Sequence, residues 1–149
     1  MIYQPTMILG VTSQIDVYID TSAFLAVLNR NDDFHFKAKS AWTKLLDSNA
    51  KLVINSFVLM ESCVLIQNRL GINALKTFIR HIQPILFIDW IEENSFHTSI
   101  YFLSEMNERS LSLVDCSSFY TMTRLHISTV FTFDSYFLRQ GFEIYQNNL

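Results

Sequence analysis

Four acidic residues stand out because each one follows, precedes or interrupts an apolar segment. Asp20 and Asp134 follow short apolar runs, Asp115 opens a helical pattern, and Glu61 lies inside an apolar stretch. Four carboxylates that converge repel one another, so some are forced to keep a proton. A hard divalent cation such as Mg²⁺ or Mn²⁺ relieves this repulsion, because it prefers oxygen ligands and joins carboxylates to phosphate oxygens. If the four side chains meet, the chemistry they indicate is metal-assisted hydrolysis of a phosphodiester.

Each carboxylate also has a purely structural interpretation. Asp20, Asp115 and Asp134 all fit the N-cap position of a helix, a role that contributes roughly 1 kcal/mol. For Glu61 the alternative is a salt bridge to an arginine that the sequence does not identify, because an unpaired charge among apolar side chains is costly. Taken one at a time, these residues leave both interpretations open.

Short apolar segments alternate with helical patterns along the chain, which indicates an α/β fold. The predicted strands are 17–19, 52–54, 85–88 and 130–133, with a further one at 142–144; the predicted helices are 22–28, 34–46, 56–70, 73–82, 91–107 and 115–125, with a helical turn at 135–138. We expect a single-domain three-layer α/β/α sandwich around a mainly parallel sheet of about four or five strands. The three aspartates then lie on one edge of the sheet, and Glu61 is close enough to its helix start to reach that edge.

Composition narrows the class of protein. The chain has 149 residues, half of them hydrophobic, and a net charge of -3, so it offers no broad basic surface for nucleic acid. Its two cysteines have no CxxC spacing and are read as packed, reduced thiols. The apolar run at 7–11 is too short for a signal peptide or membrane span. We expect a cytoplasmic protein without a membrane segment, with a leader at 1–14 before one domain at 15–149.

Several segments, in this order and spacing, resemble the PIN-domain ribonucleases of the VapC-like toxin type. The matching segments are 18–24, 55–61, 111–118 and 131–137 with Gly141-Phe142 after it, and the loop 33–38 is also similar. The resemblance covers about residues 15–144. One departure is Asn55-Ser56, where a Thr-Ser pair is usual; it puts in question a hydrogen bond behind the pocket, and not the pocket itself.

The resemblance implies roles for individual residues. It makes Asp20, Glu61, Asp115 and Asp134 the metal-binding and catalytic carboxylates, with Ser22 and Thr132 as supporting hydroxyls. It also implies Mg²⁺ or Mn²⁺ as cofactor, RNA as substrate, a homodimer, and an antitoxin protein as inhibitory partner.

Basic and aromatic residues supply weaker candidates. Arg30, Lys37, Arg124 and Arg139 lie near the acidic positions in the sequence and are candidates for RNA phosphate contacts. His35 fits the family pattern, yet its place at a helix start favours a structural role. The aromatic residues include candidates for an exposed patch that binds a partner. These are Phe34, Phe36, Phe96, Tyr101, Phe102, Tyr136 and Phe137.

The leading hypothesis is therefore a metal-dependent endoribonuclease that is the toxin of a type II toxin–antitoxin pair. Two alternatives stay open: a solitary RNA-processing nuclease, and a non-catalytic module that binds RNA or protein. A phosphatase with Asp20 as nucleophile is less well supported, because Ser22 stands where that chemistry usually has a second aspartate. Neither a GxGxxG motif nor a P-loop occurs, so nucleotide-binding folds are poorly supported.

Overall fold

Five parallel strands form the central sheet of the computed structural model, which describes residues 14–149. Their order across the sheet is β3-β2-β1-β4-β5. The strands are β1 (Asp16–Ile19), β2 (Lys51–Asn55), β3 (Phe87–Asp89), β4 (Thr129–Phe131) and β5 (Glu143–Ile144). All neighbouring pairs are parallel. The predicted α/β architecture with a parallel sheet is thus confirmed.

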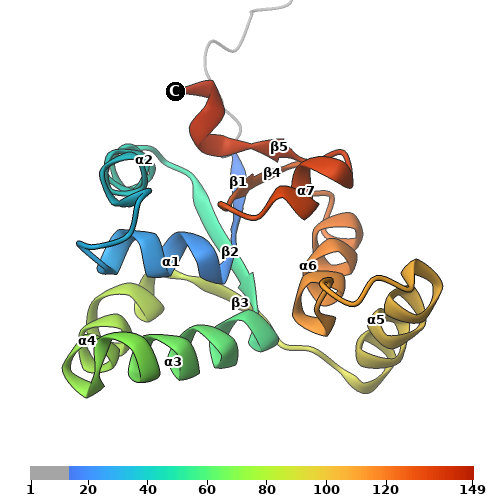
Figure 1. Ribbon diagram of the computed structural model, residues 1–149. Coiled ribbons are helices and arrows are strands. Elements are labelled where there is room, and N and C mark those ends of the chain that lie inside the picture. Colours follow the sequence, from blue (N-terminus) through green and yellow to red (C-terminus); the bar gives the residue numbers. More distant parts are fainter. Residues whose placement is uncertain (1–13) are drawn as a thin grey trace, which may run out of the picture.

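Helices cover both faces of the sheet, which gives the three layers (Figure 1). α1 to α4 lie on one side and α5 to α7 on the other, as Figure 1 shows. The helices are α1 (Thr21–Leu28), α2 (His35–Asp47), α3 (Ser56–Leu70), α4 (Ile72–Thr77), α5 (Glu93–Met106), α6 (Leu113–Arg124) and α7 (Ser135–Arg139). A π-helical turn at Phe78–Ile82 and a 3-10 turn at Gln83–Ile85 continue α4, and a last 3-10 turn spans Tyr145–Asn148.

The core forms where the strands are apolar on both faces, as a sheet covered by helices on two sides requires. Tyr18 and Ile19 of β1 and Phe131 of β4 are fully buried. Even the Tyr18 hydroxyl finds a buried partner, because it donates to Ser118 Oγ on α6 at 2.9 Å. Burial without compensating charge raises the pKa of this phenol far above its ordinary value. The middle of the sheet is therefore rigidly packed directly behind the residues that follow β1 and β4.

Several predicted boundaries were wrong, and three of them have identifiable physical reasons. Residues 83–85 form a 3-10 turn around Pro84, so the third strand starts only at Phe87. β4 ends at Phe131, because Thr132 and the backbone of Phe133 hydrogen-bond to side chains of the site instead of a neighbouring strand. α6 begins at Leu113 and not at Asp115, because Ser112 is its N-cap.

The aromatic prediction was only partly right. Phe36 and Tyr101 are strongly exposed, whereas Phe137 is completely buried and Phe102 packs against the core. The predicted leader lies outside the described residues apart from Gln14, so the bounds of the domain stay a prediction. In the part of the chain that the structure describes, no helix combines the length and the apolar character needed to cross a membrane.

Candidate active site

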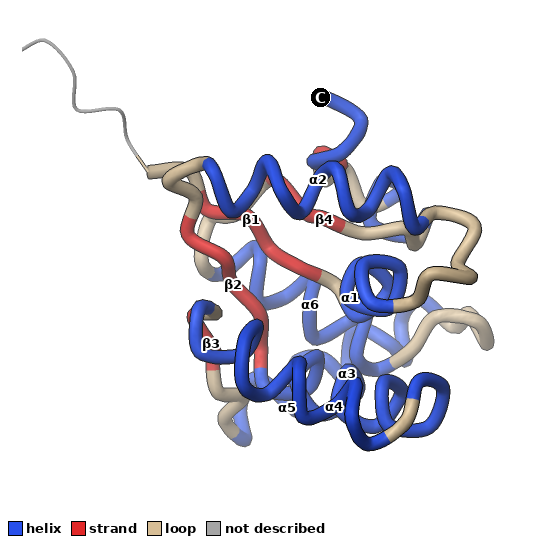
Figure 2. The backbone as a smooth tube through the Cα atoms, turned by 90° about the vertical axis from the view of Figure 1, so that its left-hand side faces the viewer, coloured by secondary structure: helices blue, strands red, loops and turns tan. Residues whose placement is uncertain are grey.

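The site lies where the strand order changes direction. From β1 the chain moves to β2 and β3 on one side, and later returns to β4 on the other side of β1. In parallel sheets ligands bind outside the carboxyl ends of the strands at such a switch point. Figure 2 shows β1 and β2 running almost directly into α1 and α3, so the first turns of these helices sit at this edge. Asp20 follows β1, and Asp134 lies shortly after the adjacent β4.

All four predicted carboxylates line one cavity at this edge. The cavity has a volume of about 280 Å³, and we call it the acidic cavity. Its lining residues are Asp20, Thr21, Ser22, Leu25, Glu61, Leu65, Arg69, Ser112, Asp115 and Asp134. The carboxylates come from four separate segments, since the junction of β1 and α1, α3, α6 and the turn after β4 each contribute one.

Asp20 is the most firmly held of the four. Its Oδ2 atom accepts hydrogen bonds from Ser22 Oγ at 2.7 Å, from Thr132 Oγ1 at 3.0 Å and from the Ser22 backbone N–H at 3.3 Å. Ser22 Oγ in turn accepts from the Phe133 backbone N–H at 2.9 Å. Ser22 and Thr132, predicted as supporting hydroxyls, thus fix one oxygen of Asp20 and tie β1 to the turn after β4.

Asp115 and Asp134 also make the local contacts of helix starts. Ser112 Oγ accepts from the Asp115 N–H, and Asp115 Oδ2 accepts from the Ser112 N–H, both at 3.0 Å, which is a capping box. Asp134 Oδ1 accepts from the Tyr136 N–H at 2.9 Å as the N-cap of α7. The N-cap interpretation therefore holds for Asp20 and Asp134, while Asp115 is the third residue of its helix.

Capping and metal binding do not compete for the same atoms. Each of the three aspartates uses one oxygen for these contacts. Within residues 14–149, Asp20 Oδ1, Asp115 Oδ1 and Asp134 Oδ2 receive no hydrogen bond from the protein. Three oxygens on the same edge of the sheet thus remain available to a cation.

Mutual repulsion and burial perturb the carboxyl groups. Burial, reinforced by Asp20 and Asp115, raises the pKa of Glu61 to about 7. Burial also raises the pKa of Asp115 to about 6, although its bonds with Ser112 oppose the change. The pKa of Asp20 is raised by burial too, against the effect of its hydrogen bonds and with a contribution from Asp134. Carboxyl groups with raised pKa values that cluster in one cavity are typical of functional sites.

Arg69 supplies one positive charge, and the sequence analysis missed it. It lies on α3, and its charge lowers the pKa of Glu61 without a direct ion pair among the described residues. Glu61, Leu65 and Arg69 are spaced by four residues, so all three face the cavity from one side of the helix. That spacing was the signal available in the sequence. Arg69 lies in the same cavity as Glu61, but no ion pair joins them in residues 14–149, so the salt bridge considered for Glu61 is not formed in this structure.

The donor set fits a hard cation better than zinc. The side-chain atoms of the cavity that could bind a metal are carboxylate and hydroxyl oxygens, the ligands that Mg²⁺ and Mn²⁺ prefer. Between residues 14 and 149, no three His, Cys, Asp or Glu side chains lie close enough together to enclose an ion directly. Mg²⁺ keeps several waters and is commonly held by one or two carboxylates, so wider spacing suits it.

The predicted basic contacts do not line the acidic cavity. Arg30 is exposed after α1, and Arg124 pairs with Asp89 at the end of β3, a contact that raises the pKa of the guanidinium. Arg139 lies over the Tyr136 ring, 4.7 Å from its centroid. Lys37 donates to Asn147 Oδ1 at 3.2 Å. A role of these residues in binding RNA stays a prediction.

Asn55, the departure from the family pattern, is completely buried behind the site. Its Oδ1 accepts from the Val58 N–H at 2.9 Å as the N-cap of α3. Its Nδ2 donates to Ser117 Oγ at 3.0 Å and to Thr121 Oγ1 at 3.2 Å. Asn55 thus joins α3, which carries Glu61, to α6, which carries Asp115.

His35 and the two cysteines do not line the acidic cavity. The buried His35 ring places Nδ1 2.8 Å from the Ala26 carbonyl, and both thiols are free.

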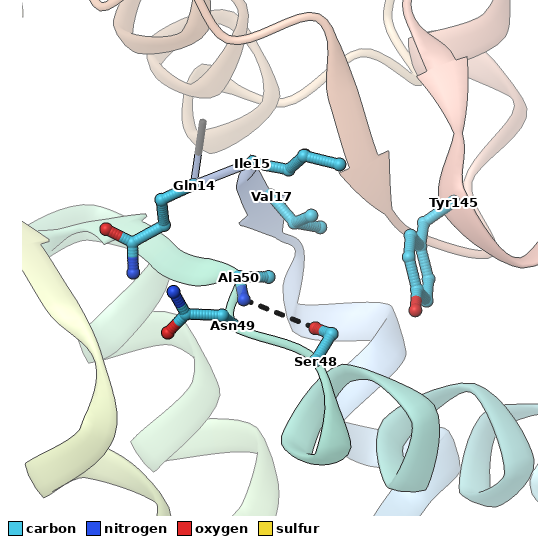
Figure 3. A pocket seen from close by; sticks show the side chains of 7 residues that line it. All are labelled: Gln14, Ile15, Val17, Ser48, Asn49, Ala50 and Tyr145. Carbon is cyan, nitrogen blue, oxygen red and sulfur yellow. Dashed lines mark hydrogen bonds between the residues drawn. The ribbon is translucent and has the colours of Figure 1, made fainter. Parts of the chain in front are cut away.

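Another cavity, of about 340 Å³, lies at the opposite, amino-terminal edge of the sheet (Figure 3). Its lining side chains are neutral, and Figure 3 shows Tyr145 and Ser48 on its walls. It lacks the groups needed for the chemistry considered above.

Comparison with known proteins decides the family. The model of the PIN domain matches residues 17–143, a span that includes all four carboxylates and nearly the whole sheet. The chain belongs to the PIN-domain family. The predicted membership of the family is thus confirmed, and with it the fold class.

The similar proteins include a bacterial toxin. The 23S rRNA-specific endonuclease VapC20 of Mycobacterium tuberculosis, in strains CDC 1551 / Oshkosh and H37Rv, is 27% identical over 128 residues, which cover 85% of this chain and 95% of the relative. The crystal structure of VapC20, described as a sarcin-ricin loop cleaving toxin, matches with a TM-score of 0.74 at 26% identity over 85% of this chain and 95% of that one. FitAcB from Neisseria gonorrhoeae matches with a TM-score of 0.63 at 13% identity, covering 86% and 95%, which shows the fold alone.

Proposed function

We propose that this chain is a metal-dependent endoribonuclease that hydrolyses RNA phosphodiester bonds. The observation that carries the proposal is the acidic cavity, in which Asp20, Glu61, Asp115 and Asp134 converge from four segments. The 27% identical relative is an RNA endonuclease by name, which supports RNA as the substrate class.

The protein groups have distinct parts in this proposal. Asp20, Asp115 and Asp134 would hold Mg²⁺ or Mn²⁺ through the oxygens that capping leaves open. When bound, the cation supplies charge neutralisation at the phosphate and lowers the pKa of a water. Glu61, whose pKa is raised to about 7, is suited to take a proton from the attacking water near neutral pH. Arg69 lies in the same cavity and attracts the phosphate group.

We further propose that the protein is the toxin of a type II toxin–antitoxin pair and acts as a homodimer. The support is the similarity to toxins of the VapC type over 85% of the chain. The relatives make 23S rRNA the first substrate to test. A solitary RNA-processing nuclease would share the same site and differ in its target and partner.

The test is cleavage of ribosomal RNA by purified protein with Mg²⁺ or Mn²⁺. We expect cleavage by the wild type and none by Asp20→Asn or Asp115→Asn. Asp33→Asn, at an exposed position outside the acidic cavity, is the matched control and should cut normally. Equal cleavage by all four proteins would refute the assignment of the site, and no divalent binding in calorimetry would favour a non-catalytic module.

The toxin proposal needs its own measurements. Induced expression in a bacterial host should arrest growth with the wild type and not with Asp20→Asn. Light scattering of the purified protein should give twice the mass of the 17.4 kDa chain. Normal growth with an active nuclease would leave the enzyme assignment intact and contradict the toxin assignment.

A further inference from the structure

A second hollow adjoins the acidic cavity, and Asp134 lines both. It has a volume of about 210 Å³, and we call it the aromatic groove. The residues that matter here are Phe34, Lys37, Phe133, Asp134, Leu138 and Gln146. A polymer whose phosphate sits in the acidic cavity therefore has its neighbouring nucleoside within reach of the groove.

The groove has a flat aromatic wall. The rings of Phe34 and Phe133 are stacked, with centroids 4.7 Å apart and planes inclined by 13°. Phe34 is 50% exposed and Leu138 is 61% exposed, so the apolar surface faces solvent. Phe34 comes from the loop before α2 and Phe133 from the turn after β4, so the wall forms only in the folded chain. Exposed aromatic rings such as that of Phe34 are a common platform for the bases of single-stranded nucleic acids.

The wall is tied to the carboxylates by short contacts. The Phe133 N–H donates to Ser22 Oγ, which donates to Asp20 Oδ2. The Asp134 N–H donates to Thr132 Oγ1 at 3.0 Å, and that hydroxyl also bonds to Asp20. On the other side, the Phe34 N–H donates to Asp32 Oδ1 at 2.8 Å, which fixes the loop. A base on this wall would therefore be held in register with the acidic cavity.

Polar groups at the groove match a nucleotide more than an apolar peptide. Lys37 is exposed and lines the groove, so its ammonium group is placed to bind a flanking phosphate of the RNA. Gln146 is only 6% exposed and donates through Nε2 to the Thr132 carbonyl. Its Oε1 is the one buried side-chain oxygen or nitrogen in residues 14–149 without a hydrogen-bond partner. That oxygen is enclosed by the protein, and the Nε2 bond ties the 3-10 turn that carries Gln146 to Thr132, next to the aromatic wall.

We propose that the aromatic groove binds one base of single-stranded RNA next to the bond to be cleaved, with the base stacked on the Phe34–Phe133 pair. This inference rests on the proposed function, because it places the phosphodiester in the acidic cavity. It makes the loop before α2 a determinant of which RNA segment is cut.

The experiment measures RNA binding separately from cleavage. Fluorescence anisotropy would follow a labelled single-stranded RNA of about ten nucleotides binding to the Asp20→Asn protein in Mg²⁺. In that background, Phe34→Leu keeps an apolar side chain and removes the stacking ring, whereas Phe34→Tyr keeps the ring. Tyr101→Leu, 67% exposed on α5, is the matched control for loss of an exposed aromatic residue.

Base stacking sets the size of the expected effect. Phe34→Leu should weaken RNA binding about tenfold, while Phe34→Tyr and Tyr101→Leu should stay within about twofold of the parent. A fully abasic strand of the same length should bind the parent about tenfold more weakly than intact RNA does, and this difference should shrink with Phe34→Leu. Thermal unfolding shows whether each variant is folded.

The outcomes separate the two proposals. If Phe34→Leu binds intact RNA as tightly as Tyr101→Leu does, the base-binding groove is refuted and the exposed ring is left to a protein partner. That result alongside RNA cleavage by the wild type overturns the groove alone. If the wild type cuts no RNA and Phe34→Leu still lowers RNA affinity selectively, the nuclease proposal fails; base binding by the groove then stands, and its place beside a cleaved bond is refuted.

Discussion

Neutralising Glu61 should stabilise the metal-free protein at alkaline pH. In Glu61→Gln the side chain keeps its size and loses its charge. The raised pKa of Glu61, about 7 against an ordinary value of 4.5, means that the folded protein resists ionising this group, because burial and the charges of Asp20 and Asp115 oppose it. The substitution removes that cost and leaves the other three carboxylates in place.

The sign and size follow from proton linkage. Below about pH 4.5 Glu61 is protonated in the folded and unfolded chains alike, so its ionisation costs nothing. As pH rises to about 7 the unfolded chain loses this proton and the folded chain keeps it, so the wild type loses stability. One pKa unit corresponds to about 1.4 kcal/mol, but Glu61 is partly exposed and solvent screens its interactions. We therefore expect a loss of roughly 1–2 kcal/mol from Glu61.

Urea unfolding in EDTA at several pH values between about 4.5 and 8.5 measures this contribution. Wild type and Glu61→Gln should have similar unfolding free energies near pH 4.5. Glu61→Gln should be more stable by roughly 1–2 kcal/mol at pH 8. Glu105→Gln, on the exposed face of α5, controls for the loss of one negative charge elsewhere. Millimolar Mg²⁺ should stabilise the wild type at pH 8 and narrow its difference from Glu61→Gln, because a ligand of the folded state shifts unfolding.

A difference between wild type and Glu61→Gln that does not change with pH would refute the reasoning. Such a result would mean that folding does not raise the pKa of Glu61, for instance because an ion pair with Arg69 offsets the cost of burial. A stability that rises with pH only in the wild type would also refute the reasoning, because it requires that the pKa of Glu61 is lowered in the folded state.

Three further predictions concern single contacts. Asn55→Ala should lower the unfolding free energy by roughly 2–4 kcal/mol in urea titrations, because it removes an N-cap and two buried hydrogen bonds, while Asn55→Thr keeps a cap and should cost less. Ser22→Ala should reduce nuclease activity more than stability, because Ser22 Oγ links Asp20 to the Phe133 N–H; unchanged kcat would contradict this. Arg69→Gln should tighten Mn²⁺ binding several-fold in calorimetry and raise KM for RNA, because one positive charge leaves the acidic cavity; weaker Mn²⁺ binding would count against its placement there.

The fold was largely predictable because its signals are local. Apolar runs, a polar residue at each strand end and Gly71 after α3 marked most elements within a few residues. The errors arose where side chains from distant segments compete with regular backbone pairing. Thr132 ends β4 because it bonds to Asp20, more than a hundred positions earlier, and no local pattern contains that information.

The site was predictable in its acidic members and less so in the rest. Carboxylates after strands indicate an edge of the sheet, but an arginine on a polar helix face looks like ordinary surface. Arg69 becomes distinctive only through its spacing from Glu61 and its place in the acidic cavity. Gln146 is a similar case, since its bond to the Thr132 carbonyl depends on how the last turn of the chain packs.

The strand order has a consequence for how the protein folds during its synthesis on the ribosome. Of the five described strands β1 is made first, yet one of its two neighbours, β4, is made fourth. Until residues 129–134 leave the exit tunnel, Asp20 lacks its bond from Thr132, and Asp134 is not yet in place at the edge of the sheet. Such distant pairing is slow to form. A nascent chain of this topology is thus unable to assemble its acidic cavity until residues 129–134 have emerged, and the proposed nuclease stays inert until then.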